Sequence, residues 1–247
     1  MRGIPIRGQT GVRLVVAAKP PFVLDVDRGS VTRVAGVPSQ KRGGLWVLSV
    51  AGRAAVIALG HWPEAKLYAV SGRAARVVSL GTGQSVAPAG GGGAVWIKTF
   101  RRSRCALRGL RLDGRPLGAP RAFPCATTIY PGGSLGLIVN RTRVLNPRTG
   151  RTVLRTRWGV LAAAGSKLVL AGPGEQFTLL DARRHTQRRF RSPGIVGGIP
   201  QPAVDPRGRF IALAFGDPAW HGGGQQALDV WLLDTKTAKL TQVPGMP

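Results

Sequence analysis

The chain has 247 residues, of which 43% are hydrophobic, so it can bury a sizeable core and is not a disordered protein. No apolar run reaches the roughly 18 residues of a membrane-spanning helix, and residues 1–19 lack the apolar stretch and cleavage site of a signal peptide. The 36 basic residues against 10 acidic ones give a formal net charge of +26, which favours an anionic partner.

The basic charge is spread along the chain rather than gathered in one block. Arg accounts for 29 of the basic residues and Lys for 7, beside abundant Ala, Gly, Pro and Val, as GC-rich codon usage would produce. No nucleic-acid-binding motif accompanies the charge. We therefore expect a general attraction to anionic surfaces and no specific nucleic-acid function.

Taken in chain order, the predicted elements repeat one hairpin. An apolar strand ends near Asp or Asn, a short turn follows that in most copies contains Gly, and a second strand departs. Asp or Asn starts such a turn through its side chain, and Gly supplies a positive φ. His185 and Ala238 stand where the last two copies should have Gly. The six copies are Phe22–Val34, Leu67–Val78, Leu110–Leu117, Arg143–Leu154, Phe177–Thr186 and Val230–Leu240.

Two further apolar stretches precede the hairpins and supply inner strands, as Leu45–Val50 and Ala54–Leu59 do for the second copy. The turns recur about every 42 residues, a spacing typical of propeller blades, and no helical pattern with a cap is present. The sequence thus predicts an all-β fold, a single β-propeller domain over residues 1–247 with about six four-stranded blades. The approximate units are 1–38, 39–83, 84–125, 126–157, 158–193 and 194–247.

The first unit begins with what should be its second strand, at residues 12–17. Propellers close by pairing strands from the two ends of the chain, because an unpaired edge leaves backbone groups unsatisfied. The missing strand could lie beyond Pro247, in which case the chain is a fragment and seven blades are possible.

The last repeat, Val204–Phe215 followed by Leu228–Thr241, resembles the WD40-like repeat of TolB-type propellers. Asp205-Pro206-Arg207-Gly208-Arg209 stands where that family has S-P-D-G-K, with Arg207 in place of the family's Asp. The resemblance covers about a fifth of the chain. It implies a propeller fold and a protein-interaction role, often in the cell envelope, with no catalytic residues to carry over.

The two cysteines predict a disulfide. A hairpin turning at Gly114–Pro116 places residues whose numbers sum to about 230 opposite each other, and Cys105 and Cys125 meet that condition. Such a bridge closes a loop of about 20 residues and would add about 3 kcal/mol. It indicates an oxidising compartment, cell envelope or exterior, although the given chain has no signal peptide. The alternative is two unrelated thiols.

A binding face is predicted where the loops between second and third strands meet the loops between blades. Exposed Trp beside Arg is typical of binding hot spots. Each Trp could instead pack back on its own loop. The expected binding residues are His61, Trp62, Arg101, Arg102, Arg104, Trp220 and His221.

Patterns for catalysis are weak. Gly132-Gly133-Ser134-Leu135-Gly136 spells a nucleophile-elbow motif, but no helix follows it, so we expect a turn. The histidines lack paired ligand spacing, and no carboxylate pair suits glycoside chemistry. We expect no catalytic residue, no metal and no cofactor.

The sequence therefore favours a monomeric, non-enzymatic propeller that binds a protein or an anionic polymer in the cell envelope or exterior. One alternative is a hydrolase or lyase that acts on a polyanionic carbohydrate. Another is a purely structural module of a longer chain.

Overall fold

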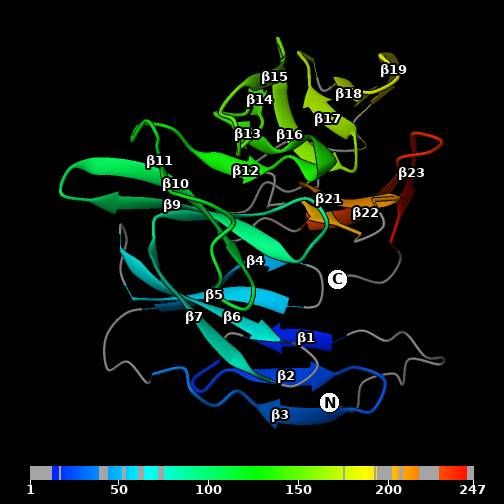
Figure 1. Cartoon of the computed structure of the whole chain (residues 1–247). Coiled ribbons are helices and arrows are strands. Elements are labelled where there is room, and N and C mark those ends of the chain that lie inside the picture. The colour runs from blue at the N-terminus through cyan, green and yellow to red at the C-terminus, as the bar shows by residue number, and fades with distance from the viewer. Residues whose placement is uncertain are drawn as a thin grey trace. The chain divides into compact units, whose positions relative to one another are not determined.

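The computed structural model describes residues 13–16, 18–38, 44–51, 54–60, 64–71, 75–174, 176–191, 193, 202–205, 208–216 and 228–243. Its contacts divide the chain into two compact units, Met1–Ala126 and Thr127–Pro247. Each unit contains three antiparallel sheets, visible in Figure 1 as meanders of neighbouring arrows.

The first unit holds eleven strands in the residues that the structure describes. They are β1 (Arg13–Val16), β2 (Phe22–Asp25) and β3 (Ser30–Arg33) in the first sheet, β4 (Gly44–Ala51), β5 (Ala54–Gly60), β6 (Ala65–Ser71) and β7 (Val77–Gly83) in the second, and β8 (Ser85–Pro88), β9 (Ala94–Arg101), β10 (Arg104–Arg111) and β11 (Arg121–Ala122) in the third.

The second unit holds twelve strands within its described part. They are β12 (Ile129–Pro131), β13 (Leu137–Val139), β14 (Arg143–Leu145) and β15 (Thr152–Arg155), then β16 (Gly159–Ala164), β17 (Lys167–Ala171), β18 (Gln176–Asp181) and β19 (Thr186–Arg191), then β20 (Ala203–Val204), β21 (Phe210–Gly216), β22 (Leu228–Asp234) and β23 (Lys239–Gln242).

Every sheet pairs its strands in chain order, as a simple up-and-down meander. Five sheets have four strands, and the first has three among the described residues. These sheets are the six blades of a β-propeller, and we number the blades 1 to 6 along the chain. The fold predicted from the hairpin repeat is confirmed. The strand predicted at residues 12–17 corresponds to β1, and its place as the second strand of its blade remains a prediction.

Burial falls from the inner strands of a blade to the outer strand. The second strand of blade 2, β5, is an uninterrupted apolar run in which Ala55–Leu59 are all buried, because both faces of that sheet are covered by neighbours. The outermost strand β19 carries mostly exposed residues. Sheets 1 and 2, 2 and 3, 4 and 5, and 5 and 6 share apolar cores between their faces. The inner strands therefore lack the alternation of apolar and polar residues that is typical of a sheet with one face in solvent.

The turn between the third and fourth strands has one conformation in most blades. A polar side chain at its first position accepts hydrogen bonds from backbone N–H groups further along, as Asn146 does from Arg148 and Thr149. Four residues after that position the backbone takes a positive φ, at Gly29, Ala75, Gly150, His185 and Ala238. The two positions where the sequence lacks the expected Gly therefore keep the left-handed conformation, with φ of 54° at His185 and 61° at Ala238.

The motif Gly132–Gly136 is a turn, as expected. It forms a short 3-10 helix, Gly133–Leu135, between β12 and β13, and the Ser134 N–H donates to the Gly165 carbonyl at 2.9 Å. This 3-10 turn is the one helical element among the described residues. A nucleophile elbow needs a strand followed by an α-helix, so Ser134 is not in that geometry.

Candidate functional site

Three of the predicted binding residues lie at the tip of one long hairpin. Strands β9 and β10 pair over their whole length, from Arg101↔Arg104 to Ala94↔Arg111. Arg102 and Ser103 form the turn, with φ of 49° and 61°, the two positive values that a tight type I′ turn requires. The turn therefore points out from a regular two-stranded scaffold rather than from a long loop.

The side chains at this tip are free cations. Arg101, Arg102 and Arg104 are all exposed. In the part of the chain that the structure describes, no hydrogen bond or ion pair engages their guanidinium groups. Three unpaired cations on one rigid turn form a surface that attracts anions.

The other four residues predicted for this face lie outside the described residues. His61 and Trp62 fall in the link between β5 and β6, and Trp220 and His221 fall in the link between β21 and β22. Their grouping with the arginines remains a prediction.

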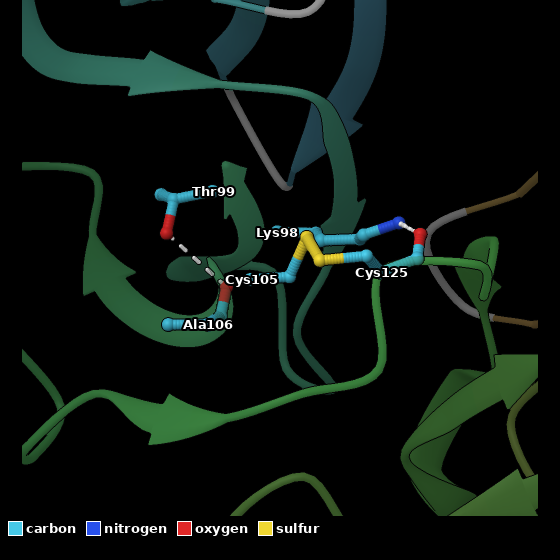
Figure 2. Close-up of a disulfide and its surroundings, with 5 residues drawn as sticks. All are labelled: Lys98, Thr99, Cys105, Ala106 and Cys125. Atoms are coloured by element: carbon cyan, nitrogen blue, oxygen red, sulfur yellow. Dashed lines mark hydrogen bonds between the residues drawn. A yellow bond between two sulfur atoms is a disulfide. The ribbon is translucent and has the colours of Figure 1, made fainter. Parts of the chain in front are cut away.

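A disulfide ties the hairpin to the chain that follows it. Cys105 and Cys125 are bonded, with their Cα atoms 5.1 Å apart, as the sequence predicts (Figure 2). The predicted register is wrong by two residues: β10 pairs Ala106 with Ala122, so Phe123 lies opposite Cys105 and donates its N–H to the Cys105 carbonyl at 3.0 Å. The chain leaves the sheet at Pro124, which has no N–H to continue the ladder, and Cys125 reaches Cys105 from beyond the strand.

A lysine lies beside this disulfide. Lys98 on β9 is 3% exposed, and its Nζ donates to the Cys125 carbonyl at 2.5 Å (Figure 2). Burial lowers the pKa of Lys98 below its ordinary value. The lysine thus holds the segment after β11 alongside the disulfide, and nothing in the spacing of the sequence pointed to this contact.

The first unit also has a cavity, of about 540 Å³. It lies at the end of blade 1, between the β1–β2 link and the chain that follows β3. Pro21, Val34 and Leu59 are buried lining residues. Lys19 and Arg33 line it as exposed side chains. The described residues that line it are Ala18, Lys19, Pro20, Pro21, Arg33, Val34, Ala35, Gly36, Val37, Pro38 and Leu59.

The cavity and the arginine hairpin lie at corresponding ends of their sheets. In a four-stranded meander, the link between the second and third strands and the link to the next blade leave from the same end. The β1–β2 link, the β3–β4 link and the β9–β10 turn are of these two kinds. We call this end of blades 1 to 3 the loop face of the first unit.

Carboxylates of the turns are occupied by structural hydrogen bonds. Burial raises the pKa of Asp181, but hydrogen bonds from the Arg184 and Arg183 N–H groups and the Ser166 hydroxyl, with the charge of Lys167, lower it overall. The Lys236 N–H is the main cause of the lowered pKa of Asp234. Both side chains therefore stay ionised at neutral pH as turn acceptors.

No cluster of three His, Cys, Asp or Glu side chains suited to a metal occurs in the described ranges. Within those same ranges, no helix has the length and apolar character needed to cross a membrane. The described residues of the first unit offer exposed cations and a mostly apolar cavity as candidate binding features.

Sequence reasoning missed Lys19 and Arg33. The cavity is built by residues 18–21 and 33–38, which are rich in Pro and small side chains and look like ordinary turns. The usable signal was a basic residue and at least one proline in each of the two segments that flank one hairpin. Only the pairing of β2 with β3, which sets Phe22 opposite Arg33, shows that the two segments are neighbours.

Comparisons with known proteins identify the fold. No family model matches the chain, and no curated protein matches it by sequence. Among solved structures, it is similar to an oligogalacturonate lyase from Vibrio parahaemolyticus, with a TM-score of 0.58, 10% identity and coverage of 95% of this chain and 75% of that one.

Two further structures bear on the resemblance of the last repeat. The β-propeller domain of Cps50 (Swd1) from Myceliophteria thermophila has a TM-score of 0.54 and 13% identity, with coverage of 96% of this chain and 83% of that one. TolB from Acinetobacter baumannii has a TM-score of 0.51 and 9% identity, with coverage of 94% of this chain and 62% of TolB. This chain therefore spans less than two thirds of that TolB. At these identities the likeness concerns the fold alone. The chain is a six-bladed β-propeller with TolB-like and WD40-like structural neighbours.

Proposed function

We propose that this chain is a non-enzymatic binding module of the cell envelope or cell exterior, which binds an acidic protein or an anionic polymer through the loop face of its first unit. The observation that carries the proposal is the β9–β10 turn, where Arg101, Arg102 and Arg104 are exposed and unpaired. A guanidinium binds carboxylate, sulfate or phosphate groups through two parallel hydrogen bonds.

Two features support this use of the turn. Long paired strands hold it, so little conformational entropy is lost when it binds. The disulfide between Cys105 and Cys125 anchors the third strand of the same blade, and such bonds persist in oxidising compartments. This supports an envelope or exterior location.

The test is titration of the purified chain with polygalacturonate, a linear polyanion, at low and high salt. Replacing Arg101, Arg102 and Arg104 together by Glu should weaken binding about tenfold or more, since each reversal removes an attraction and adds a repulsion. Arg183, Arg184 and Arg189 are also exposed, at the turn and edge of blade 5, and their replacement by Glu changes the net charge equally. Equal loss in both variants would contradict a role for the loop face and indicate attraction by net charge.

An enzyme that acts on polyanionic carbohydrate is the second candidate, because a solved oligogalacturonate lyase has a similar fold. The same titration separates the two functions when the polymer is recovered and its chain length is measured. Saturable binding with an unchanged polymer supports the binding module. Shortened chains, with or without an unsaturated end, would establish a lyase or hydrolase instead.

A further inference from the structure

The cavity of blade 1 has the composition of a small-molecule site. Ligand pockets span about 300–1,000 Å³ and are mostly apolar, with a few polar groups that fix the orientation of the ligand. This one has about 540 Å³. Pro20, Pro21, Val34, Val37, Pro38, Leu59 and the alanines supply apolar walls.

Among the lining residues that the structure describes, two are cations and none is a carboxylate. Lys19 and Arg33 are exposed, and among the described residues neither side chain has a hydrogen bond or an ion pair. Both cations come directly before residues of the apolar walls: Arg33 precedes buried Val34, and Lys19 precedes Pro20 and buried Pro21. A neutral apolar ligand would leave these charges unused, and a cationic one would be repelled.

The walls are fixed before any ligand enters. The Val34 N–H donates to the Pro21 carbonyl at 3.0 Å, which extends the β2–β3 ladder to the base of the cavity. Three prolines restrict the backbone on both sides. Val34 and Leu59 also belong to the apolar core shared by blades 1 and 2. A preorganised site loses less entropy on binding.

We propose that this cavity binds a small amphipathic carboxylate, whose apolar body lies on Pro21, Val34 and Leu59 and whose carboxylate faces Arg33 and Lys19. The site is separate from the arginine turn, because Arg101, Arg102 and Arg104 are not among its lining residues. The binding of a polymer at the turn and of a carboxylate in the cavity can therefore succeed or fail independently.

Dodecanoate, below its micellar concentration, is the probe, and dodecanol is its neutral counterpart. Calorimetric titration of the whole chain should show one saturable site for dodecanoate, about tenfold tighter than for dodecanol. Equal affinity for both would overturn the role of the cations. No binding of dodecanoate would overturn the site.

Two variants locate the site on the structure. Lys19→Glu with Arg33→Glu should weaken dodecanoate binding at least about tenfold and leave dodecanol unchanged, because only the charge is reversed. Ala35→Trp, on an exposed lining residue, should weaken both ligands by filling the cavity. The Trp variant keeps the wild-type charge, so it tests the cavity even if the double reversal fails to fold.

The matched control is Arg28→Glu with Arg76→Glu. Both arginines are exposed, in or next to the third-to-fourth-strand turns of blades 1 and 2, at the opposite ends of the sheets. This control has the same net charge as the double reversal and should bind dodecanoate like the wild type. If the control weakens dodecanoate binding as much as the double reversal does, the proposal is overturned.

Discussion

Blades 3 and 5 hold their outermost strands in different ways. In blade 5, β19 pairs with β18 at six positions, and Phe190 of β19 stacks on buried Phe177 with the ring centroids 5.4 Å apart. In blade 3, β11 pairs with β10 at only two positions and both of its residues are exposed. The Cys105–Cys125 bond lies just beyond it. An outer strand with few ladder bonds and little buried area is thus accompanied by a covalent link, and one with a full ladder is not.

Removing the aromatic stack of blade 5 should have the largest effect on stability. Phe177 is 1% exposed and contacts both Phe190 and Phe215. Phe177→Ala should lower the free energy of unfolding by about 3–5 kcal/mol, because it leaves a cavity among rigid neighbours. Urea denaturation measures the change. Phe190→Ala, at a half-buried position on the same stack, should lower the free energy of unfolding by less. An equal or larger loss would show that the outer strand contributes as much to the stability of the blade as the buried ring does.

Opening the disulfide should be the next largest change and should act on blade 3. It closes a 20-residue separation, so Cys105→Ala with Cys125→Ala should cost about 3 kcal/mol. Amide hydrogen exchange shows which part of the chain loses stability. We expect faster exchange at the Phe123 N–H, which bonds Cys105 at the edge of the short ladder, and unchanged exchange along β19. Uniform acceleration in both blades would contradict the local role given to the bond.

The turn of blade 5 should show a dependence on pH. Asp181 accepts hydrogen bonds from the Arg183 and Arg184 N–H groups, and the pKa of its carboxyl is lowered in the folded state. A lowered folded-state pKa gives stability that is complete above the unfolded-state pKa and is lost as pH falls through the folded-state value. Asp181→Ala should therefore cost about 1 kcal/mol at pH 7, and the difference from the wild type should shrink below about pH 4.

Melting temperatures across that pH range measure the difference. Asp181→Asn is the matched control, because the amide oxygen can still accept the turn hydrogen bonds but does not titrate. Asn146 already serves this role in blade 4. If the Asn variant lost as much stability on acidification as the wild type does, the Asp181 carboxylate would not be the titrating group.

Substitutions at the positive-φ positions should have the smallest effects, of opposite sign in the two blades. Gly114 of blade 3 has a φ of 88°, and Gly114→Ala should cost about 1 kcal/mol. His185 of blade 5 has a φ of 54°, and His185→Gly should stabilise by about 0.5 kcal/mol as strain is relieved, less the added entropy of the unfolded chain. A loss of stability in His185→Gly would show that its side chain contributes to the turn.

The hairpin repeat could be predicted because it depends on local chemistry. Asp or Asn at the strand end and a residue able to take a positive φ define each turn within a few residues of chain. The disulfide could also be predicted from the sequence, since its 20-residue separation spans a single hairpin. Its register was wrong by two residues because the hairpin turns earlier than predicted, with Leu110 opposite Pro116, and the pairing then shifts so that Ala106 lies opposite Ala122. The position of a turn and such shifts are decided by pairing, not by composition.

The sequence by itself determined the all-β class, the six turns and the pairing of the cysteines, because each is set by residues close together in the chain. Tertiary structure decided what surrounds the cations and which residues far apart in the chain they meet. Lys19 and Arg33 become neighbours only when β2 pairs with β3, and Lys98 meets Cys125 only when blade 3 closes. Contacts of that kind depend on register and burial, which the order of residues along a strand does not specify.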